Sequence, residues 1–329
     1  MRIGVVGVHY GHIGGMFQSA LKAKDGEVVG IVESDDSLYE EYTKDRKIPR
    51  YKSLDDLLEE GRPELVLEGI NHGEKAALVE ACGKAGVHVL LDKPLCRNLE
   101  DWERIRKATE DIRISMWFTS RSYPPFLALR EAILEGALGE IVSLISTHPH
   151  KLGPWRPDWY FDPEIYTGTF HDLACHGVDQ VRWLTGAEYI GVHALETCKK
   201  HREPRPLVDH VQASFALSKG AMALLTTDWL TPQDSRSFGD SRVIVMGTRG
   251  SAPLRAYAGD HLLIVTDDRG TYEPKMPVSR DDFFVQDMIE AISRGEETFI
   301  STRDVLAVSK ACLFAQESAR QGGTFLKIE

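Results

Sequence analysis

Three things that the sequence has little of narrow the class of protein. It contains 5 cysteines, an odd number, and no two of them form a C-x-x-C pair. We therefore expect neither a disulfide framework nor a structural zinc site, which fits a reducing cytoplasm. No apolar run approaches the roughly 20 residues of a membrane span. The chain opens on a strand-like run rather than a charged segment followed by a long apolar stretch, so we expect no signal peptide.

Positive charge is the third scarce feature. The 329 residues include 39 Lys and Arg against 50 Asp and Glu, for a formal net charge of -11. A nucleic-acid-binding surface needs a basic patch, so we expect no nucleic-acid partner. Hydrophobic residues make up 42% and charged residues 27%, which is typical of a soluble globular protein, and the length suffices for two domains.

Residues 1–120 alternate short apolar runs with helix-like segments. Strands are predicted at Ile3–Val8, Val28–Val32, Leu65–Leu67, Val87–Leu91 and Ile114–Phe118. Helices are predicted at Met16–Lys24, Ser37–Asp45, Ser53–Glu59, Glu74–Ala85 and Leu99–Thr109. Because continuously apolar strands are typical of a sheet covered on both faces, we expect an α/β Rossmann domain with a doubly wound parallel sheet.

Residues 121–329 follow a different pattern. Helices are predicted at Phe126–Glu135, Thr169–Thr185, Asp281–Ser293 and Thr302–Gln321. Strands are predicted at Ile141–His148, Ile190–Leu195, His210–Leu217, Ala221–Trp229, Arg242–Met246 and His261–Thr266. Strands joined by turns predict a second, α+β domain with a large open, mainly antiparallel sheet.

The first predicted strand runs into GVVGVHYGHIGGM, which is close to the dinucleotide fingerprint G-x-G-x-x-G. Gly7 fills the first position, whereas His9 and His12 stand at the second and third. Glycines there let the backbone approach a pyrophosphate and let the helix pack on the strand. The loop predicts dinucleotide binding, with a glycine-rich turn that holds no ligand as the alternative.

The second predicted strand ends in IVES, which places Glu33 where an acid binds the adenosine ribose hydroxyls of NAD. A carboxylate there repels the extra phosphate of NADP, and residues 34–41 contain no Arg or Lys. We therefore predict NAD as the cofactor rather than NADP. An ordinary acidic turn residue is the alternative.

A lysine follows the fourth predicted strand, in the segment Asp92, Lys93, Pro94. This is the carboxyl end of a buried strand, where doubly wound sheets bind ligands. Lys93 can donate to a substrate hydroxyl or carry a proton, and Asp92 can orient a neighbour. The alternative is a lysine in a surface loop.

The stretch TGTFHDLACHGVDQVRWLTG predicts one helix with two different faces. Apolar and small residues share one face, namely Phe170, Leu173, Gly177, Val181 and Leu184. Asp172, His176 and Asp179 share the opposite face. A carboxylate beside a histidine can set its tautomer and raise its pKa, which makes an acid/base group. A solvated helix face is the alternative.

A metal site is the other alternative for these residues. Zinc or manganese could in principle be held by His148, His150, His171, His176 and Asp172. Their spacing fits no standard closed site, so we expect no metal.

Taken together, these motifs resemble those of the Gfo/Idh/MocA family of NAD(P)-dependent oxidoreductases. DKPL is similar to the family's E-K-P segment, with Asp92 in place of Glu. SRSYPPFLALREAILEGALGEIVSL is similar to its domain-junction stretch and includes Arg121. TGTFHDLACHGVDQVRWLTG resembles its G-G-x-x-x-D-x-x-x-H-x-x-D motif, and VIVMGTRGS its G-t-x-G hairpin. These motifs lie in the family's order over nearly the whole chain.

The sequence departs from the family pattern in three places. His9 and His12 replace small residues. The usual alanine-threonine-proline step after the third strand reads Glu68, Gly69, Ile70, Asn71, and without a gap Lys75 stands where the family has histidine.

The resemblance implies a role for each matching residue. Lys93 would polarise the reacting hydroxyl or carbonyl, His176 would donate or accept the proton, and Asp172 would bind substrate or assist His176. The expected cofactor-binding residues are Gly7, His9, Tyr10, Gly11, His12, Ile13, Glu33, Asn71, His72, Asp92, Lys93 and Arg121. The expected substrate contacts are Trp155, Arg156, Trp159 and Asp172.

The function implied is transfer of hydride between a nicotinamide and a secondary alcohol or ketone of a sugar, inositol or related polyol. One alternative is transient redox chemistry, as in an epimerase or in glycoside cleavage. Another is a non-catalytic regulator that uses the same fold as a sensor. The family's second domain often packs on a partner, so a homodimer or homotetramer is expected.

Overall fold

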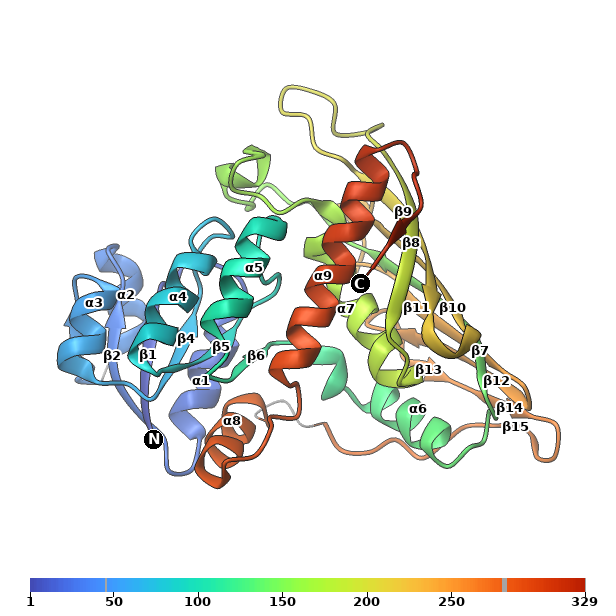
Figure 1. Cartoon of the computed structure of the whole chain (residues 1–329), viewed down its shortest axis with the longest axis horizontal. Helices are drawn as coiled ribbons and strands as arrows, with labels where there is room; N and C mark the ends of the chain where they lie inside the picture. The colour runs from blue at the N-terminus through green and yellow to red at the C-terminus, as the bar shows by residue number, and fades with distance from the viewer. Residues whose placement is uncertain (45, 280–282, 329) are drawn as a thin grey trace. The chain divides into compact units, whose positions relative to one another are not determined.

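The computed structural model describes residues 1–44, 46–279 and 283–328. They form two compact units (Figure 1). The first unit takes in residues 1–117, 164–166 and 283–306, and the second takes in residues 118–163, 167–279 and 307–328. Two residues of the predicted helix at Asp281–Ser293, and the last residue of the one at Ser37–Asp45, lie outside the described part of the chain.

The first unit is built on a parallel sheet of six strands. They are β1 (Arg2–Val6), β2 (Glu27–Val32), β3 (Arg50–Tyr51), β4 (Leu65–Glu68), β5 (His88–Leu91) and β6 (Ile114–Met116). Their order is β3-β2-β1-β4-β5-β6, so the chain reverses direction across the sheet between β1 and β4. The predicted doubly wound parallel sheet is confirmed, and the point of reversal is where such sheets bind ligands.

Helices cover this sheet. They are α1 (Ile13–Lys22), α2 (Asp36–Thr43), α3 (Leu54–Asp56), α4 (Lys75–Ala85), α5 (Leu99–Ala108) and α8 (Phe283–Arg294). Side-chain caps begin three of them, because Asp35, Ser53 and Asn98 each accept a hydrogen bond from a backbone N–H three residues on. Helix α1 begins at Ile13, before the predicted Met16, because Gly14 and Gly15 are helical.

The second unit is built on a larger, mixed sheet. Its strands are β7 (Ile141–Pro149), β8 (Tyr189–Thr197), β9 (His210–Leu217), β10 (Met222–Asp228), β11 (Ser241–Gly247), β12 (Gly250–Ala256), β13 (His261–Leu262), β14 (Ile264–Thr266), β15 (Gly270–Tyr272) and β16 (Leu326–Lys327). The order is β15-β14-β12-β11-β7-β10-β9-β8-β16, with β13 beside β12. Within this sheet, β7 and β10 are the one parallel pair among the described residues, so the mainly antiparallel sheet is confirmed.

Three helices complete this unit, namely α6 (Pro124–Leu134), α7 (Thr169–Thr185) and most of α9 (Thr302–Arg320). Helix α7 lies against β7 and β10 and has the predicted bounds. Gly177 permits this packing, because a Cβ there would lie 2.1 Å from Nε2 of His148 on β7.

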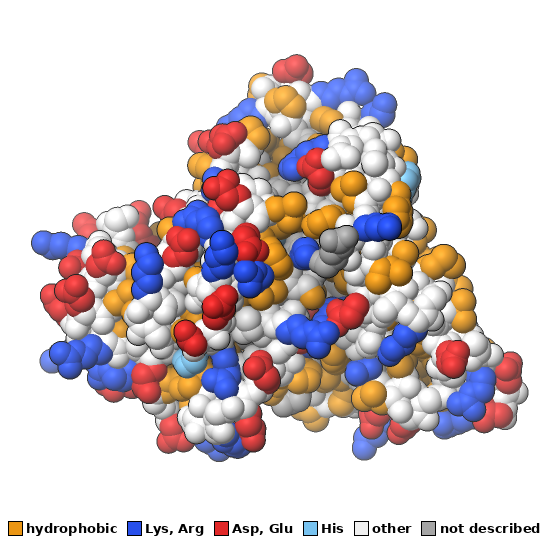
Figure 2. Space-filling view, in the orientation of Figure 1, with side chains coloured by type: hydrophobic (Ala, Val, Ile, Leu, Met, Phe, Trp, Pro, Cys, Tyr) orange, Lys and Arg blue, Asp and Glu red, His pale blue; other side chains and the backbone are white. Residues whose placement is uncertain are grey.

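Some predicted elements were wrong or missing. The predicted strand His261–Thr266 is two strands, β13 and β14. Strand β12 was missed because Gly250 and Pro253 are depleted in strands, although Pro253 pairs with Ile244. On the face drawn in Figure 2, acidic and basic side chains are interspersed. Over the described residues, no helix is long and apolar enough to cross a membrane.

Candidate functional site

The loop between β1 and α1 makes a close approach to the loop after β4. Gly7 has φ +69°, and a Cβ there would lie 2.7 Å from Cγ2 of Ile70 and 2.9 Å from the carbonyl oxygen of Gly69. Its backbone N–H donates to the carbonyl of Val32 at 2.8 Å. Only glycine fits this tight turn, while contact of Gly7 with a cofactor remains a prediction.

The two histidines of this loop each face a carboxylate. Nδ1 of His9 lies 3.4 Å from Oε2 of Glu33, and Nδ1 of His12 lies 2.8 Å from Oδ1 of Asp92. The histidine side chains are 41% and 44% exposed, whereas the two carboxylates are buried. His12 is also the residue that precedes the first turn of α1, and its backbone N–H donates to Oδ2 of Asp92 at 2.8 Å. The loop thus carries two carboxylate-paired imidazoles.

Glu33 lies at the end of β2 with both carboxylate oxygens occupied by donors. Oε2 accepts the N–H of Val8, and Oε1 accepts the N–H of Asp35, each at 2.9 Å. Burial works against the charged form. The hydrogen bonds from Asp35, Val8 and His9 outweigh it and hold the pKa of Glu33 below its ordinary value. A stable carboxylate at this place is what recognition of ribose hydroxyls requires.

Arg50 is a neighbour of Glu33 that the sequence analysis missed. Its Nε donates to the carbonyl of Glu33 at 2.8 Å, its Nη1 lies 2.5 Å from Oδ1 of Asp36, and its guanidinium lies over the Tyr39 ring. Arg50 lies beyond residues 34–41, the segment without Arg or Lys that follows Glu33. Strand β3 has two residues, too few to give a periodic signal, yet it brings this arginine to the end of β2.

The Asp92 side chain accepts hydrogen bonds within the turn that carries Lys93 and from the loop before α1. Its Oδ1 accepts the backbone N–H of Lys93 at 2.8 Å as well as the His12 imidazole. Burial disfavours its charge, but His12, Lys75 and Lys93 outweigh that penalty and hold its pKa well below the ordinary value. Lys93 itself is 8% exposed, so the alternative of an open surface loop is wrong.

A buried ion pair lies under this turn. Nζ of Lys75 lies 2.8 Å from Oε1 of Glu68 and donates to the Asp92 carbonyl at 2.6 Å. The same Glu68 oxygen accepts the backbone N–H of Asp92 at 2.8 Å. Both side chains of the pair are 0% exposed. Burial raises the pKa of Glu68, and the Lys75 charge opposes that rise. The pair thus holds both backbone groups of Asp92.

The other predicted cofactor residues of this unit lie nearby. His72 is buried, stacks on Tyr166, and has Nε2 at 3.3 Å from the Tyr10 hydroxyl. Oδ1 of Asn71 accepts the Gly73 N–H at 2.9 Å. Ile13 is 2% exposed and packs where a Cβ on Gly69 would lie. Their contact with a cofactor remains a prediction.

In the second unit, α7 holds the predicted acid/base residues. Asp172 is 0% exposed, and His176, one turn later, is partly exposed with its ring edge-on to Phe118 at 5.9 Å. Asp179 is also 0% exposed. The alternative of a solvated helix face is therefore wrong. A buried polar face needs partners inside the protein.

Asp179 has a partner that the helix pattern did not suggest. Arg121 donates to it through Nε at 2.9 Å and Nη2 at 2.6 Å, and both side chains are buried. This two-point contact fastens the segment after β6 to α7. It gives Arg121 a structural role, while its predicted contact with the cofactor remains a prediction.

The residues considered for a metal site have other neighbours. Nε2 of His148 lies 2.8 Å from the Ser146 hydroxyl, and Nδ1 of His171 lies 3.0 Å from the Thr167 hydroxyl. Burial lowers the pKa of His148 to about 4, so it is neutral near pH 7. Within the described ranges, no three His, Cys, Asp or Glu side chains gather as metal ligands would.

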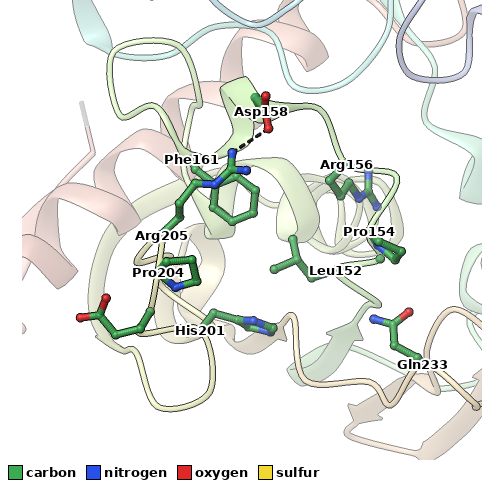
Figure 3. A pocket seen from close by; sticks show the side chains of 11 residues that line it. Leu152, Pro154, Arg156, Asp158, Phe161, His201, Pro204, Arg205 and Gln233 are labelled. Carbon is green, nitrogen blue, oxygen red and sulfur yellow. Dashed lines mark hydrogen bonds and ion pairs between the residues drawn. The ribbon is translucent and has the colours of Figure 1, made fainter.

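A pocket of about 420 Å³ opens in the second unit beside the loop before α7 (Figure 3). Arg156 lines it, with its guanidinium over the rings of Tyr160 and Trp229. Arg205, across the pocket, lies over Phe161 and pairs with Asp158 at 2.7 Å. Of the predicted substrate residues, Arg156 lines this pocket. Trp155 packs near Phe238 and Trp159 against Tyr160.

Replacing Gly11 by alanine tests how closely the loop and the Asp92 turn fit. Gly11 has φ +71°, and a Cβ there would lie 1.6 Å from Oδ2 of Asp92. We expect a loss of stability of about 2–4 kcal/mol, measured by chemical denaturation, because the carboxylate must leave His12. Gly86 is the matched control, with φ +70° and nothing within 4 Å. A Gly86→Ala loss as large as that of Gly11→Ala would contradict this account.

Two family models match the chain. The model "Oxidoreductase family, NAD-binding Rossmann fold" matches residues 1–113, and the model "GFO/IDH/MocA C-terminal domain" matches residues 126–252. The two models together span most of the chain, one for each unit.

Individual relatives agree with these models. A myo-inositol 2-dehydrogenase of Thermotoga maritima is 28% identical over 82% of this chain and 79% of its own length. A D-xylose 1-dehydrogenase (NADP(+)) of Haloferax volcanii is 23% identical over 92% of this chain and 93% of its own. An Agrobacterium radiobacter oxidoreductase, solved with NAD+, L-tartaric acid and magnesium, shares the fold with a TM-score of 0.84 at 19% identity, over 100% of this chain and 98% of its own. The chain belongs to the Gfo/Idh/MocA family of NAD(P)-dependent oxidoreductases.

Proposed function

We propose that the protein is an NAD-dependent dehydrogenase that oxidises a secondary alcohol of a sugar, inositol or related polyol, or reduces the matching ketone. The observation that carries this proposal is the Lys93 turn. A buried network fixes the lysine at the carboxyl end of β5, where ligands of doubly wound sheets bind. The names of the inositol and xylose dehydrogenases support the substrate class.

The residues of the first unit fit a dinucleotide. The sheet has the strand order of dinucleotide-binding domains, and Gly7 makes the close approach that a pyrophosphate loop needs. The charged Glu33 favours ribose hydroxyls over a ribose phosphate and so supports NAD. Arg50 lies beside it and is the side chain through which NADP could be accepted, but Asp36 already neutralises it.

The bound nicotinamide would supply or accept the hydride, and the protein would manage one proton. We propose that Lys93 donates a hydrogen bond to the reacting oxygen. His176 takes the hydroxyl proton during oxidation, and the buried Asp172 assists it or binds a neighbouring hydroxyl. Arg156 is proposed to contact the substrate from the pocket that it lines.

The cofactor is tested by calorimetry of NAD and NADP binding to the purified chain. We expect NAD to bind more tightly than NADP, and Glu33→Ala to weaken NAD at least tenfold, because charge-assisted hydrogen bonds to the ribose are lost. Glu27→Ala, at the other end of β2, is the matched control and should bind as the parent does.

A screen of inositols, aldoses and other polyols for net NADH formation follows. Net NADH from at least one of them supports a dehydrogenase. Turnover without net NADH would favour transient redox chemistry instead. Failure of the parent to bind either nucleotide would favour the regulator alternative and overturn the proposal.

A further inference from the structure

We propose that His12 and His9 bind the diphosphate of the dinucleotide as positively charged side chains, and that this binding takes up protons. The inference rests on the proposed function only in requiring a dinucleotide cofactor. It goes beyond that function by assigning the diphosphate contact to imidazoles rather than to glycine backbone.

Imidazole side chains occupy loop positions that are glycine in the usual fingerprint. In the usual fingerprint the second and third glycines let the backbone come close to the diphosphate. Here His9 and His12 stand at those positions, and their side chains are 41% and 44% exposed. A ligand at the N-terminus of α1 therefore meets these side chains as well as the backbone. Imidazolium groups are suitable partners for a diphosphate, and they add to the favourable helix dipole.

Asp92 sets the orientation of the His12 ring. Its Nδ1 is directed to Oδ1 of Asp92, a buried carboxylate that also accepts the His12 backbone N–H. Because a carboxylate accepts only, the Nδ1 position carries a proton, and a second proton goes to Nε2. Asp92 thus holds the ring by a hydrogen bond to Nδ1. Lys93 and Lys75 are the other cations that act on Asp92, and Glu68 offsets Lys75.

His9 likewise faces a buried carboxylate, that of Glu33. Its Nδ1 faces Oε2 of Glu33, a buried carboxylate that accepts the backbone N–H groups of Val8 and Asp35. Arg50 is the cation beside Glu33, and it pairs with Asp36. Each loop histidine therefore has one carboxylate of its own, and each carboxylate accepts one backbone N–H from its own turn and one from the loop between β1 and α1.

The charge of the diphosphate fixes the direction of the pH effect on binding. A histidine with an ordinary pKa of about 6.5 is mostly neutral at about pH 7.5. A diphosphate close to the ring favours the charged form and raises the pKa in the complex. Binding therefore takes up protons, and the affinity for the dinucleotide falls as pH rises.

The test is calorimetry of NAD binding to the full chain at about pH 7.5, in several buffers of different ionisation enthalpy and without phosphate. The slope of the observed enthalpy against the ionisation enthalpy gives the protons taken up. We expect about 0.5–1.5 protons per NAD, and a dissociation constant that rises about tenfold or more between about pH 6.5 and pH 8.5. Adenosine, which lacks the diphosphate, should bind without proton uptake.

Three variants test which histidines take up the protons on NAD binding. His12→Asn keeps a donor for Asp92 but cannot become a cation, so the uptake should fall by at least half, and the variant with His9→Asn added should show none. His261→Asn is the matched control, because that exposed histidine also lies near a carboxylate, that of Glu273 in the second unit. The inference about His9 and His12 is overturned if the parent binds NAD without proton uptake, or if the double variant keeps the full uptake. Neither outcome overturns the proposed function. A parent that binds neither nucleotide overturns the proposed function as well.

Discussion

Replacing Lys75 by methionine should lower the free energy of unfolding by about 3–5 kcal/mol, because the change leaves the Glu68 carboxylate buried without its cation. Methionine has a similar length but cannot donate to the Asp92 carbonyl. The variant loses both contacts of Nζ, at 2.8 and 2.6 Å. Chemical denaturation followed by circular dichroism measures the loss. Lys84→Met is the matched control, because Lys84 lies exposed on the same helix, α4, and its loss should be within about 0.5 kcal/mol.

The pH dependence of the stability loss shows whether the buried Glu68 charge causes it. Without Lys75, the pKa of Glu68, already raised by burial, should rise further. A carboxyl whose pKa is raised on folding favours the folded state at low pH and loses that effect as pH rises through the raised pKa. The deficit of Lys75→Met should therefore be larger at about pH 8 than at about pH 5.

A double variant separates charge from shape. Glu68→Gln removes the buried negative charge and keeps an acceptor for the Asp92 N–H. Combined with Lys75→Met, it should recover at least half of the lost stability, since the remaining pair is neutral. A deficit that is independent of pH and unrelieved in the double variant would mean that packing, not the ion pair, explains the loss.

The sequence was sufficient for the first unit because its signal is local. Each core strand of a parallel sheet is a short apolar run, and the turn glycine and the acid after β2 lie at fixed distances from it. For the same reason Lys93 could be placed at the end of β5. The helix at Thr169–Thr185 was predicted with its bounds because a period of 3.6 residues is unambiguous over 17 residues.

Partners across elements could not be predicted. Glu68 and Lys75 were noted as departures from the family pattern, yet nothing in a linear pattern says that the end of β4 and the start of α4 meet at one buried point. Asp179 was assigned to the acid/base face because its partner, Arg121, is 58 residues away. Arg50 was overlooked because β3 is too short to recognise. These are the contacts that set charge and pKa in the site.

Lys93→Met and His176→Asn should each lower kcat on an accepted polyol about 10²–10⁴-fold, the usual size of a general acid–base contribution. Both variants should still fold and bind NAD. Lys93 is held through its backbone N–H, which methionine keeps, and His176 is partly exposed on a helix whose core contacts come from other residues. Steady-state kinetics with calorimetry of NAD binding measures both effects. His193→Asn, an exposed histidine of β8, is the matched control and should leave kcat unchanged.

Combining the two changes decides whether these residues act on the same proton. If Lys93 polarises the oxygen whose proton His176 takes, removing either group disables the same step. The double variant should then lose much less than the product of the two single losses. Independent roles, such as cofactor positioning by one and proton transfer by the other, predict losses that multiply. A single variant with parental kcat would remove that residue from the mechanism, and parental kcat in both would mean that other groups carry the proton.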